Sequence, residues 1–306
     1  MISNRAYAGR THITWALIPC LVIPALLTLS LPALAQNSLL HESRQPASTS
    51  TTISRGTIAL SQIAGLASGP SKYKLLYLAH PRPTRSRDTS RIARNERVIL
   101  NTIQELNEQL TLPFDVNISL ETCGEPNASY NHDNRQVTIC YEMVDVFYSL
   151  FSRTMKRGTK LNEAVEGAML SLFLHEVGHA LVDACDLPVT GREEDAVDQL
   201  STLILINSRI SRERMALNGA RVFRILANME RHESKFFWDE HSTFAQRYYD
   251  TICLIYGHDP DKYEYLVSSK QLPEERAAKC GAEYQRVKNA WSQLLEPYTK
   301  QSLNIH

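Results

Sequence analysis

The chain has 306 residues, and its 33 Lys and Arg residues balance 33 Asp and Glu residues, so the formal net charge is zero. This balance gives no support to a nucleic-acid-binding surface, and the arginines between residues 82 and 97 are better explained as a solvated connector. The sequence contains no internal repeat and no glycine-rich loop of the kind that binds phosphate.

The first 35 residues have the layout of a secretory signal peptide. Arg5 and Arg10 precede an apolar stretch from Ile13 to Pro32, and Ala33-Leu34-Ala35 supplies a small-x-small cleavage site. The apolar stretch is also long enough to span a bilayer, so an uncleaved anchor is the competing interpretation. Its prolines and the cleavage site favour removal. We therefore expect export, to the periplasm or the medium, with no stable membrane insertion after removal of residues 1–35.

Residues 36–69 are expected to form a linker, because their first part is rich in Ser and Thr and poor in large apolar residues. The folded domain should then span residues 70–300. Tyr73 to His80 predicts its first strand. Phe114 to Leu120 predicts another, whose alternation places Asp115, Asn117 and Ser119 on a wet face.

Between these strands, apolar residues recur at helical spacing from Ile92 to Leu110 and predict an amphipathic helix. Beyond Glu142 the chain is expected to be wholly helical. The predicted fold class is therefore α+β, with a small mixed sheet in the N-terminal half and a mainly helical C-terminal half.

Five cysteines follow the predicted signal peptide, a set that suits two disulfides and one free thiol in an oxidising compartment. Cys123 and Cys140 flank a predicted hairpin, so we pair them. Cys253 and Cys280 are paired by proximity. Cys185 is then predicted to be a free, buried thiol.

His175-Glu176-Val177-Gly178-His179 is an HExxH motif, which supplies two metal ligands and a candidate general base. On a helix both imidazoles stand on one face, with Cβ atoms roughly 5 to 6 Å apart. Zinc in such sites keeps three protein ligands and a water, lowers the pKa of that water to about 7, and a neighbouring carboxylate such as Glu176 can take its proton.

A buried structural histidine pair is the alternative, but each ring would then need a separate hydrogen-bond partner. The motif belongs to a run of positions with four-three spacing, which predicts one buried helical seam: Leu161, Val165, Ala168, Leu172, His175, His179 and Val182.

A second helix is expected to follow the motif after a short break. The first helix should end near Asp186, because Pro188 disfavours helical geometry in the residue before it. Thr190 to Glu193 matches a capping box that would start the next helix. The two helices would then form a hairpin.

This second helix is expected to supply the third metal ligand. At about 1.5 Å per residue, His179 lies roughly 10 Å from the turn, Glu194 roughly 6 Å and Asp198 roughly 12 Å. We assign Glu194 as the third ligand and Asp198 as an acceptor for the second N–H of a zinc-bound histidine. The reverse assignment, with Asp198 as the ligand, remains open. Glu193 and Asp195 point elsewhere and are explained as a dipole-favourable helix start.

The motif and the downstream Glu194-x-x-x-Asp198 resemble the gluzincin pattern, in which the third zinc ligand is a Glu on the next helix. Over about residues 70 to 290 the chain more closely resembles a bacterial metallopeptidase family without an assigned function. The segments that carry this resemblance are Leu187 to Asp195, Asn127 to Tyr130, Ile139 to Glu142 and Trp238 to His241. The resemblance implies a zincin-like fold and a zinc site more than it implies a substrate.

Similarity to thermolysin-like enzymes also implies roles outside the motif. Asn127 and Ala128 match the start of an edge strand that binds a peptide substrate through its backbone. A plain hairpin strand explains the segment equally well. A downstream His or Tyr stabilises the tetrahedral intermediate in such enzymes. His241 is our candidate, with rivals at His232, Tyr248 and Tyr249.

Together these inferences predict an exported zinc metallopeptidase in which His175, His179 and Glu194 hold Zn²⁺ and Glu176 is the general base. Its partner would be a peptide or protein substrate, inferred from family likeness. One alternative is a catalytically inactive, zinc-stabilised envelope or peptide-binding protein, and another is a zinc amidase that acts on cell-wall peptides.

Overall fold

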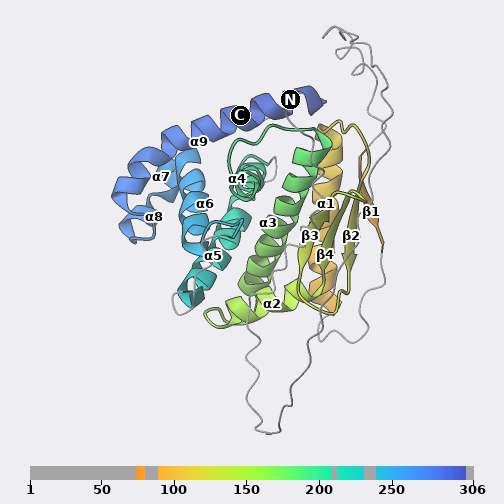
Figure 1. Cartoon of the computed structure of the whole chain (residues 1–306). Coiled ribbons are helices and arrows are strands. Elements are labelled where there is room, and N and C mark those ends of the chain that lie inside the picture. Colours follow the sequence, from red (N-terminus) through yellow and green to blue (C-terminus); the bar gives the residue numbers. More distant parts are fainter. Residues whose placement is uncertain (1–73, 80–88, 209–211, 231–238, 301–306) are drawn as a thin grey trace, which may run out of the picture. The chain divides into compact units, whose positions relative to one another are not determined.

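The computed structural model describes residues 74–79, 89–208, 212–230 and 239–300, which all fall in one compact unit (Figure 1). The predicted signal peptide and linker lie outside the described residues. The first elements are β1 (Leu75–Leu78), α1 (Thr89–Gln109), β2 (Val116–Glu121), β3 (Ala128–Asn131), β4 (Gln136–Cys140) and α2 (Glu142–Ser152). They are followed by α3 (Thr159–Ala184), α4 (Glu193–Ile206), α5 (Glu213–Glu230), α6 (Phe244–His258), α7 (Pro260–Tyr263), α8 (Tyr265–Ser268) and α9 (Glu274–Leu295).

The predicted α+β class is confirmed, because the four strands precede Glu142 and the described elements after it are helical. The strand order is β1-β2-β4-β3. The first three strands in this order are parallel, whereas β3 runs antiparallel to β4. The long helix α1 forms the crossover that parallel β1 and β2 require. Within the described part of the chain β3 pairs on one side only, so it is an edge strand.

One detail of the strand prediction is wrong. Ser119 was expected on a wet face of β2, yet it is fully buried. Its hydroxyl donates a hydrogen bond to Oε2 of Glu121 at 2.5 Å. A hydroxyl that has a hydrogen-bond partner is tolerated in the interior, so a polar residue at position 119 does not require an exposed face.

The structure brings both expected cysteine pairs, Cys123 with Cys140 and Cys253 with Cys280, to disulfide distance. Cys185 is a free thiol and is buried. None of the helices in the described ranges has the length and apolar character that crossing a bilayer requires.

Helix α3, which carries the HExxH motif, is buried on more sides than one seam would require. Leu170, Phe173 and Leu174, which lie outside the predicted seam, are fully buried. Helix α3 packs against α1, β3 and β4 on one side and against α4 and α5 on the other (Figure 1). The approach of α4 is close, because a Cβ added to Gly178 would lie 2.8 Å from Cβ of Val197. A glycine inside the motif therefore lets the first turn of α4 reach the histidines.

Candidate metal centre

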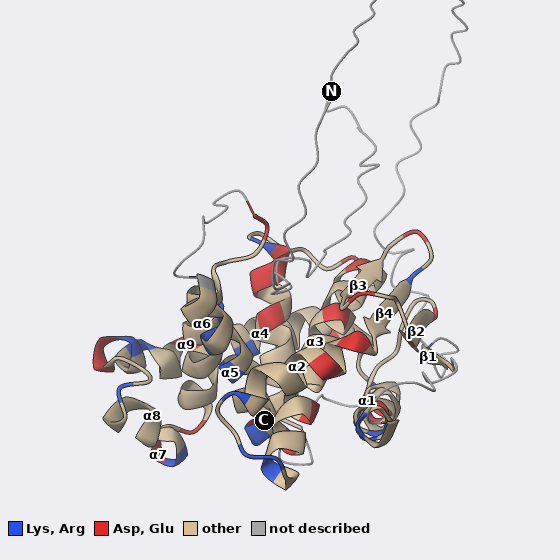
Figure 2. Cartoon of the chain, turned by 90° about the horizontal axis from the view of Figure 1, so that it is seen from below, with Lys and Arg blue, Asp and Glu red and all other residues tan. Residues whose placement is uncertain are grey.

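Helix α4 begins at Glu193, but not through the predicted capping box. Arg192 is its N-cap residue and makes no side-chain capping bond within the described structure. The Glu193 carboxylate instead lies 2.7 Å from Nδ1 of His179. The capping prediction is wrong because the helix begins at Glu193 itself, so Thr190 lies before the N-cap position. The acidic start of α4 is visible in Figure 2.

The side chains of His175, His179 and Glu194 converge at the junction of α3 and α4. The two Nε2 atoms lie 3.3 Å apart. Oε2 of Glu194 lies 3.1 Å from Nε2 of His175, and Oε1 lies 3.6 Å from Nε2 of His179. Exposed fractions of 4%, 8% and 6% show that all three side chains are enclosed. Zinc ligands about 2.0 to 2.2 Å from the ion are separated by similar distances in a tetrahedral site.

A carboxylate holds the second ring nitrogen of each motif histidine. Nδ1 of His175 lies 2.8 Å from Oδ1 of Asp198, and Nδ1 of His179 faces Glu193. A proton on Nδ1 leaves Nε2 with a free lone pair, which is how outer partners prepare a histidine for a metal. Glu194 therefore lies on the Nε2 side of the histidines, whereas Asp198 contacts Nδ1 of His175.

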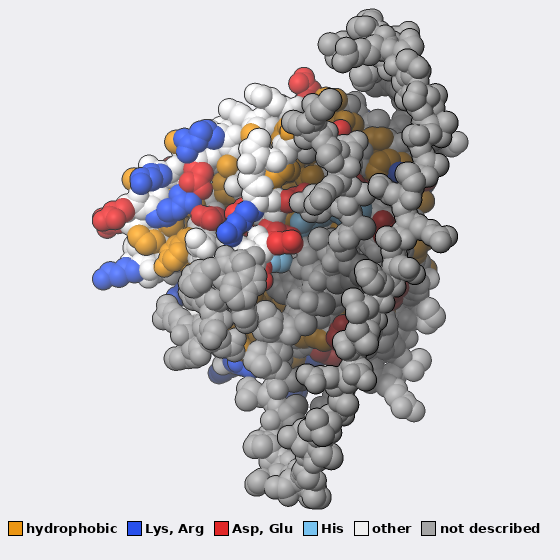
Figure 3. Space-filling model, viewed as in Figure 1, with side chains coloured by type: hydrophobic (Ala, Val, Ile, Leu, Met, Phe, Trp, Pro, Cys, Tyr) orange, Lys and Arg blue, Asp and Glu red, His pale blue; other side chains and the backbone are white. Residues whose placement is uncertain are grey.

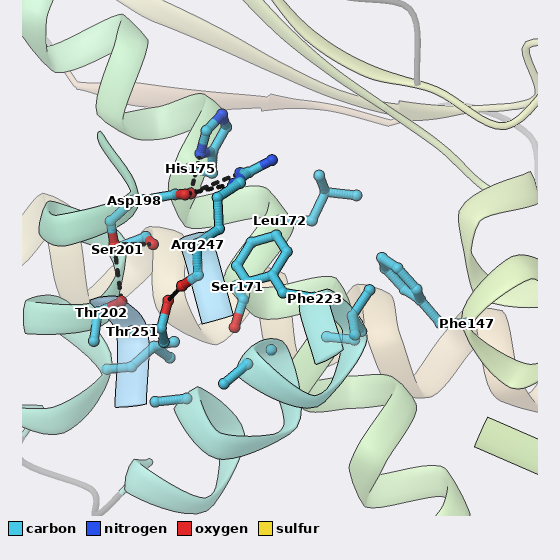
Figure 4. A pocket seen from close by; sticks show the side chains of 16 residues that line it. Phe147, Ser171, Leu172, His175, Asp198, Ser201, Thr202, Phe223, Arg247 and Thr251 are labelled. Carbon is cyan, nitrogen blue, oxygen red and sulfur yellow. Dashed lines mark hydrogen bonds and ion pairs between the residues drawn. The ribbon is translucent and has the colours of Figure 1, made fainter. Parts of the chain in front are cut away.

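Arg247 completes this chain of contacts and was not predicted from the sequence. From α6 its Nε and Nη2 atoms donate to Asp198 at 2.6 and 2.8 Å, while its guanidinium lies 4.3 Å from the centre of the Phe223 ring. Figure 4 shows the Asp198 carboxylate in contact with both His175 and Arg247. Arg247 lies 49 residues after Asp198, and no local pattern in the sequence connects the two.

Glu176 carries two buried carboxylate oxygens, and neither has a hydrogen-bond partner among the described residues. A buried polar group without a partner is costly and requires an explanation. The charges of His175, His179, Glu194 and His241 all act on this carboxylate, so it lies beside the converging side chains. Burial raises the pKa of Glu176, and it therefore accepts a proton more readily than an ordinary glutamate.

His241 lies at the same cluster, just before α6. Its Nε2 atom is 2.9 Å from Oε2 of Glu194, and its Nδ1 atom is 3.1 Å from Oδ1 of Asp239. Ligand atoms of His175, Glu194 and His241 all lie within 4.8 Å of one another, which is compatible with a metal site. Among the rivals, His232 lies outside the described residues, and no described contact of the cluster involves Tyr248 or Tyr249.

The cluster is electrostatically coupled. Burial alone would raise the pKa of Glu194, but its contacts with the histidines hold that pKa well below its usual range. Burial alone would lower the pKa of His179, but hydrogen bonds to the Glu193 and Glu194 carboxylates raise it to about 10. The metal-free site therefore holds protons that a cation can replace, and proton release is expected when a metal binds to histidine ligands.

The space-filling view shows a small area of histidine surface beside acidic side chains (Figure 3). A cavity of ≈ 30 Å³ lies behind the cluster and is lined by His175, Asp198, Arg247 and Phe223, among others (Figure 4). Glu176, His179, Glu194 and His241 do not line it. This cavity lies on the Nδ1 side of His175 and is not the place where a metal or a substrate would meet the Nε2 atoms.

The predicted substrate strand adjoins the motif helix. Ala128 is fully buried at the start of β3 and pairs with Ile139 of β4. Oδ1 of Asn127 is buried without a hydrogen-bond partner among the described residues. The strand is tied to α3 by Tyr130, whose hydroxyl donates to Oδ2 of Asp183 at 2.6 Å. Asp183 lies one turn beyond His179, so the strand passes the end of α3 that follows the motif.

Comparison with known proteins gives one match. A family described as "Putative metallopeptidase" matches residues 79–295, which contain all the residues of the cluster. No curated protein and no solved structure matches the chain significantly.

Proposed function

Since the chain belongs to this metallopeptidase family, we propose that it is an exported zinc-dependent peptidase with Glu176 as its general base. The observation that supports this proposal best is the arrangement of the motif. The Nε2 atoms of His175 and His179 converge on Glu194, while each Nδ1 atom is held by a carboxylate. A merely structural histidine pair has no need for this orientation.

The residues present fit a zinc ion. Two or three imidazoles and one carboxylate are ligands that zinc prefers. Both oxygens of Glu176 are buried and lack a hydrogen-bond partner within the described residues, and Oε2 of Glu194 is buried between the Nε2 atoms of His175 and His241. A cation near Glu194 would compensate its buried charge. When bound, zinc supplies Lewis acidity, which acidifies a coordinated water and polarises a carbonyl group.

The chain's own side chains would perform the remaining steps. Glu176 takes the proton of the attacking water, which its raised pKa favours. His241, supported at Nδ1 by Asp239, donates to the oxyanion that forms from the peptide carbonyl. The free edge of β3 would hold the peptide as an added strand beyond its fully buried first residue, Ala128, where Ser129 and Asn131 are less buried. Asn127 precedes this edge with an amide oxygen that has no partner among the described residues.

Export is part of the proposal. It is supported by the layout of residues 1–35 and by the two cysteine pairs at disulfide distance. Assignment of zinc rather than another divalent ion rests on the ligand types.

Glu176→Gln tests the proposed function. We expect the variant to keep its zinc and to lose cleavage of a panel of denatured proteins by at least about 100-fold, the lower range of a general base's contribution. Glu163→Gln is the control, because Glu163 lies on the same helix with a 42% exposed side chain and should leave cleavage unchanged. A folded, zinc-loaded Glu176→Gln protein with wild-type cleavage would overturn the role.

A catalytically inactive protein with a structural zinc is the second candidate. It is favoured by one observation, the proximity of His241 to Glu194, because structural zinc sites usually have four protein ligands. A wild-type protein that binds zinc but cleaves nothing in the panel would support this candidate.

A further inference from the structure

His241 is held in the same way as the two motif histidines. Its Nδ1 atom contacts a carboxylate, Asp239, at 3.1 Å, compared with 2.8 and 2.7 Å for the corresponding contacts in the motif. Its Nε2 atom points to Oε2 of Glu194 at 2.9 Å. A ring with a proton on Nδ1 presents the lone pair of Nε2, so His241 has the orientation of a metal ligand.

The geometry of the cluster accommodates a third imidazole. The rings of His241 and His175 are inclined by 17° and their centres are 6.3 Å apart, so the two rings face the site side by side. Ligand atoms of these two residues and of Glu194 lie within 4.8 Å of one another. Atoms bound to one zinc ion at about 2.0 to 2.2 Å lie roughly 3.3 to 3.6 Å apart in a tetrahedron, so these three atoms need only a small adjustment. His179 joins them through its contacts of 3.3 Å with His175 and 3.6 Å with Glu194.

His241 is also the least enclosed member of the cluster. Its side chain is 21% exposed, compared with 4% for His175 and 6% for Glu194. It lies before α6 instead of within a helix, and its partner Asp239 is 44% exposed. The other three candidate ligands lie on α3 and α4, whose packing at Gly178 fixes their spacing. Of the four candidates, His241 can therefore leave at the smallest structural cost.

From these observations we infer that His241 is a fourth, exchangeable zinc ligand. It would coordinate the metal in the resting protein and dissociate from it when a peptide carbonyl binds. The inference rests on the proposed function, because a peptidase must open a coordination position, whereas a structural site has no need to. The two roles of His241 are successive, because a ring that coordinates zinc through Nε2 cannot at the same time donate a hydrogen bond from that atom.

X-ray absorption at the zinc edge tests this inference, because it counts the imidazoles bound to the ion without reference to activity. The full purified chain should show three imidazoles, and His241→Ala should show two. His258→Ala is the matched control, since its side chain is 22% exposed, similar to that of His241, and lies against Tyr284 and Glu213. It should retain three. Addition of a peptide hydroxamate, which binds zinc through its own oxygens, should reduce the wild-type count to two.

The outcomes separate this inference from the proposed function. Two imidazoles in a zinc-loaded, active wild-type protein would overturn the assignment of His241 as a ligand but not the proposed peptidase function. Three imidazoles that persist with the hydroxamate bound would overturn the exchange. A wild-type protein that binds no zinc would overturn both proposals together.

Discussion

Arg247→Met removes the buried partner of Asp198 and keeps a side chain of similar length. Arg247 is 4% exposed, and the substitution deletes contacts of 2.6 and 2.8 Å to the carboxylate. Loss of one partner from a buried ion pair typically costs about 3–5 kcal/mol. We expect the free energy of unfolding of the metal-free protein to fall by about 3 kcal/mol, the lower end, because Nδ1 of His175 still contacts Asp198.

The same substitution should weaken zinc binding. Asp198 orients the ring of His175, and loss of an outer partner typically lowers metal affinity by about 10 to 100-fold. Urea denaturation in the presence of a chelator measures the stability, and competition with a chromophoric chelator measures the zinc affinity. Arg214→Met is the control, because Arg214 is 79% exposed in its pair with Glu163 and should cost less than about 1 kcal/mol.

A double variant identifies the cause. Arg247→Met combined with Asp198→Asn removes the stranded charge as well as its partner, and it should be more stable than Arg247→Met alone. A cost for Arg247→Met no larger than that for Arg214→Met would contradict the contribution of the buried ion pair. A double variant no more stable than Arg247→Met would contradict the stranded charge as the cause.

Three further predictions follow from packing and covalent links. Gly178→Ala should destabilise the protein by about 1–3 kcal/mol in urea titrations, because its Cβ would lie 2.8 Å from Val197. Gly281→Ala is the control: its Cβ would meet open space, so it should stabilise the protein by roughly 1 kcal/mol, and equal effects of the two substitutions would contradict the close packing at Gly178. Cys185 should resist iodoacetamide at pH 8 in the native protein and react in urea, because its thiol is buried and burial raises its pKa to about 12. Mass spectrometry measures the labelling, and rapid labelling of the native protein would contradict the prediction. Replacement of Cys253 and Cys280 by Ala opens a link of sequence separation 27 and should cost about 3–4 kcal/mol by calorimetry, and an unchanged melting temperature would contradict the link.

The sequence predicts the parts of this fold that repeat at short range. Helical spacing locates α1 and α3, and the flanked hairpin predicts the partner of Cys123. It does not show that α3 is covered on more than one side, since residues such as Phe173 and Leu174 become buried only after distant helices pack. Ser119 was misplaced for a related reason, because a hydroxyl that finds a nearby acceptor can be buried.

The candidate site also has parts that the sequence predicts and parts that it does not. The HExxH motif and the spacing of the two hairpin helices predict that His175, His179 and Glu194 lie together. Glu193 was missed because a helix-dipole argument already explained an acidic residue at that position. Arg247 was missed because only the packing of α6 against α4 brings it to Asp198. A residue that contacts a metal ligand's partner from a distant helix cannot be predicted from the local sequence pattern.

Metal analysis of the purified mature protein tests the central claim most directly. Wild-type protein should contain about one zinc ion per chain. His175→Ala should lose nearly all of it, because the substitution removes an enclosed ligand whose ring is oriented by Asp198. His132→Ala, at a side chain that is 53% exposed, should retain the metal. A folded wild-type protein without zinc, or a His175→Ala protein that keeps it, would contradict the account.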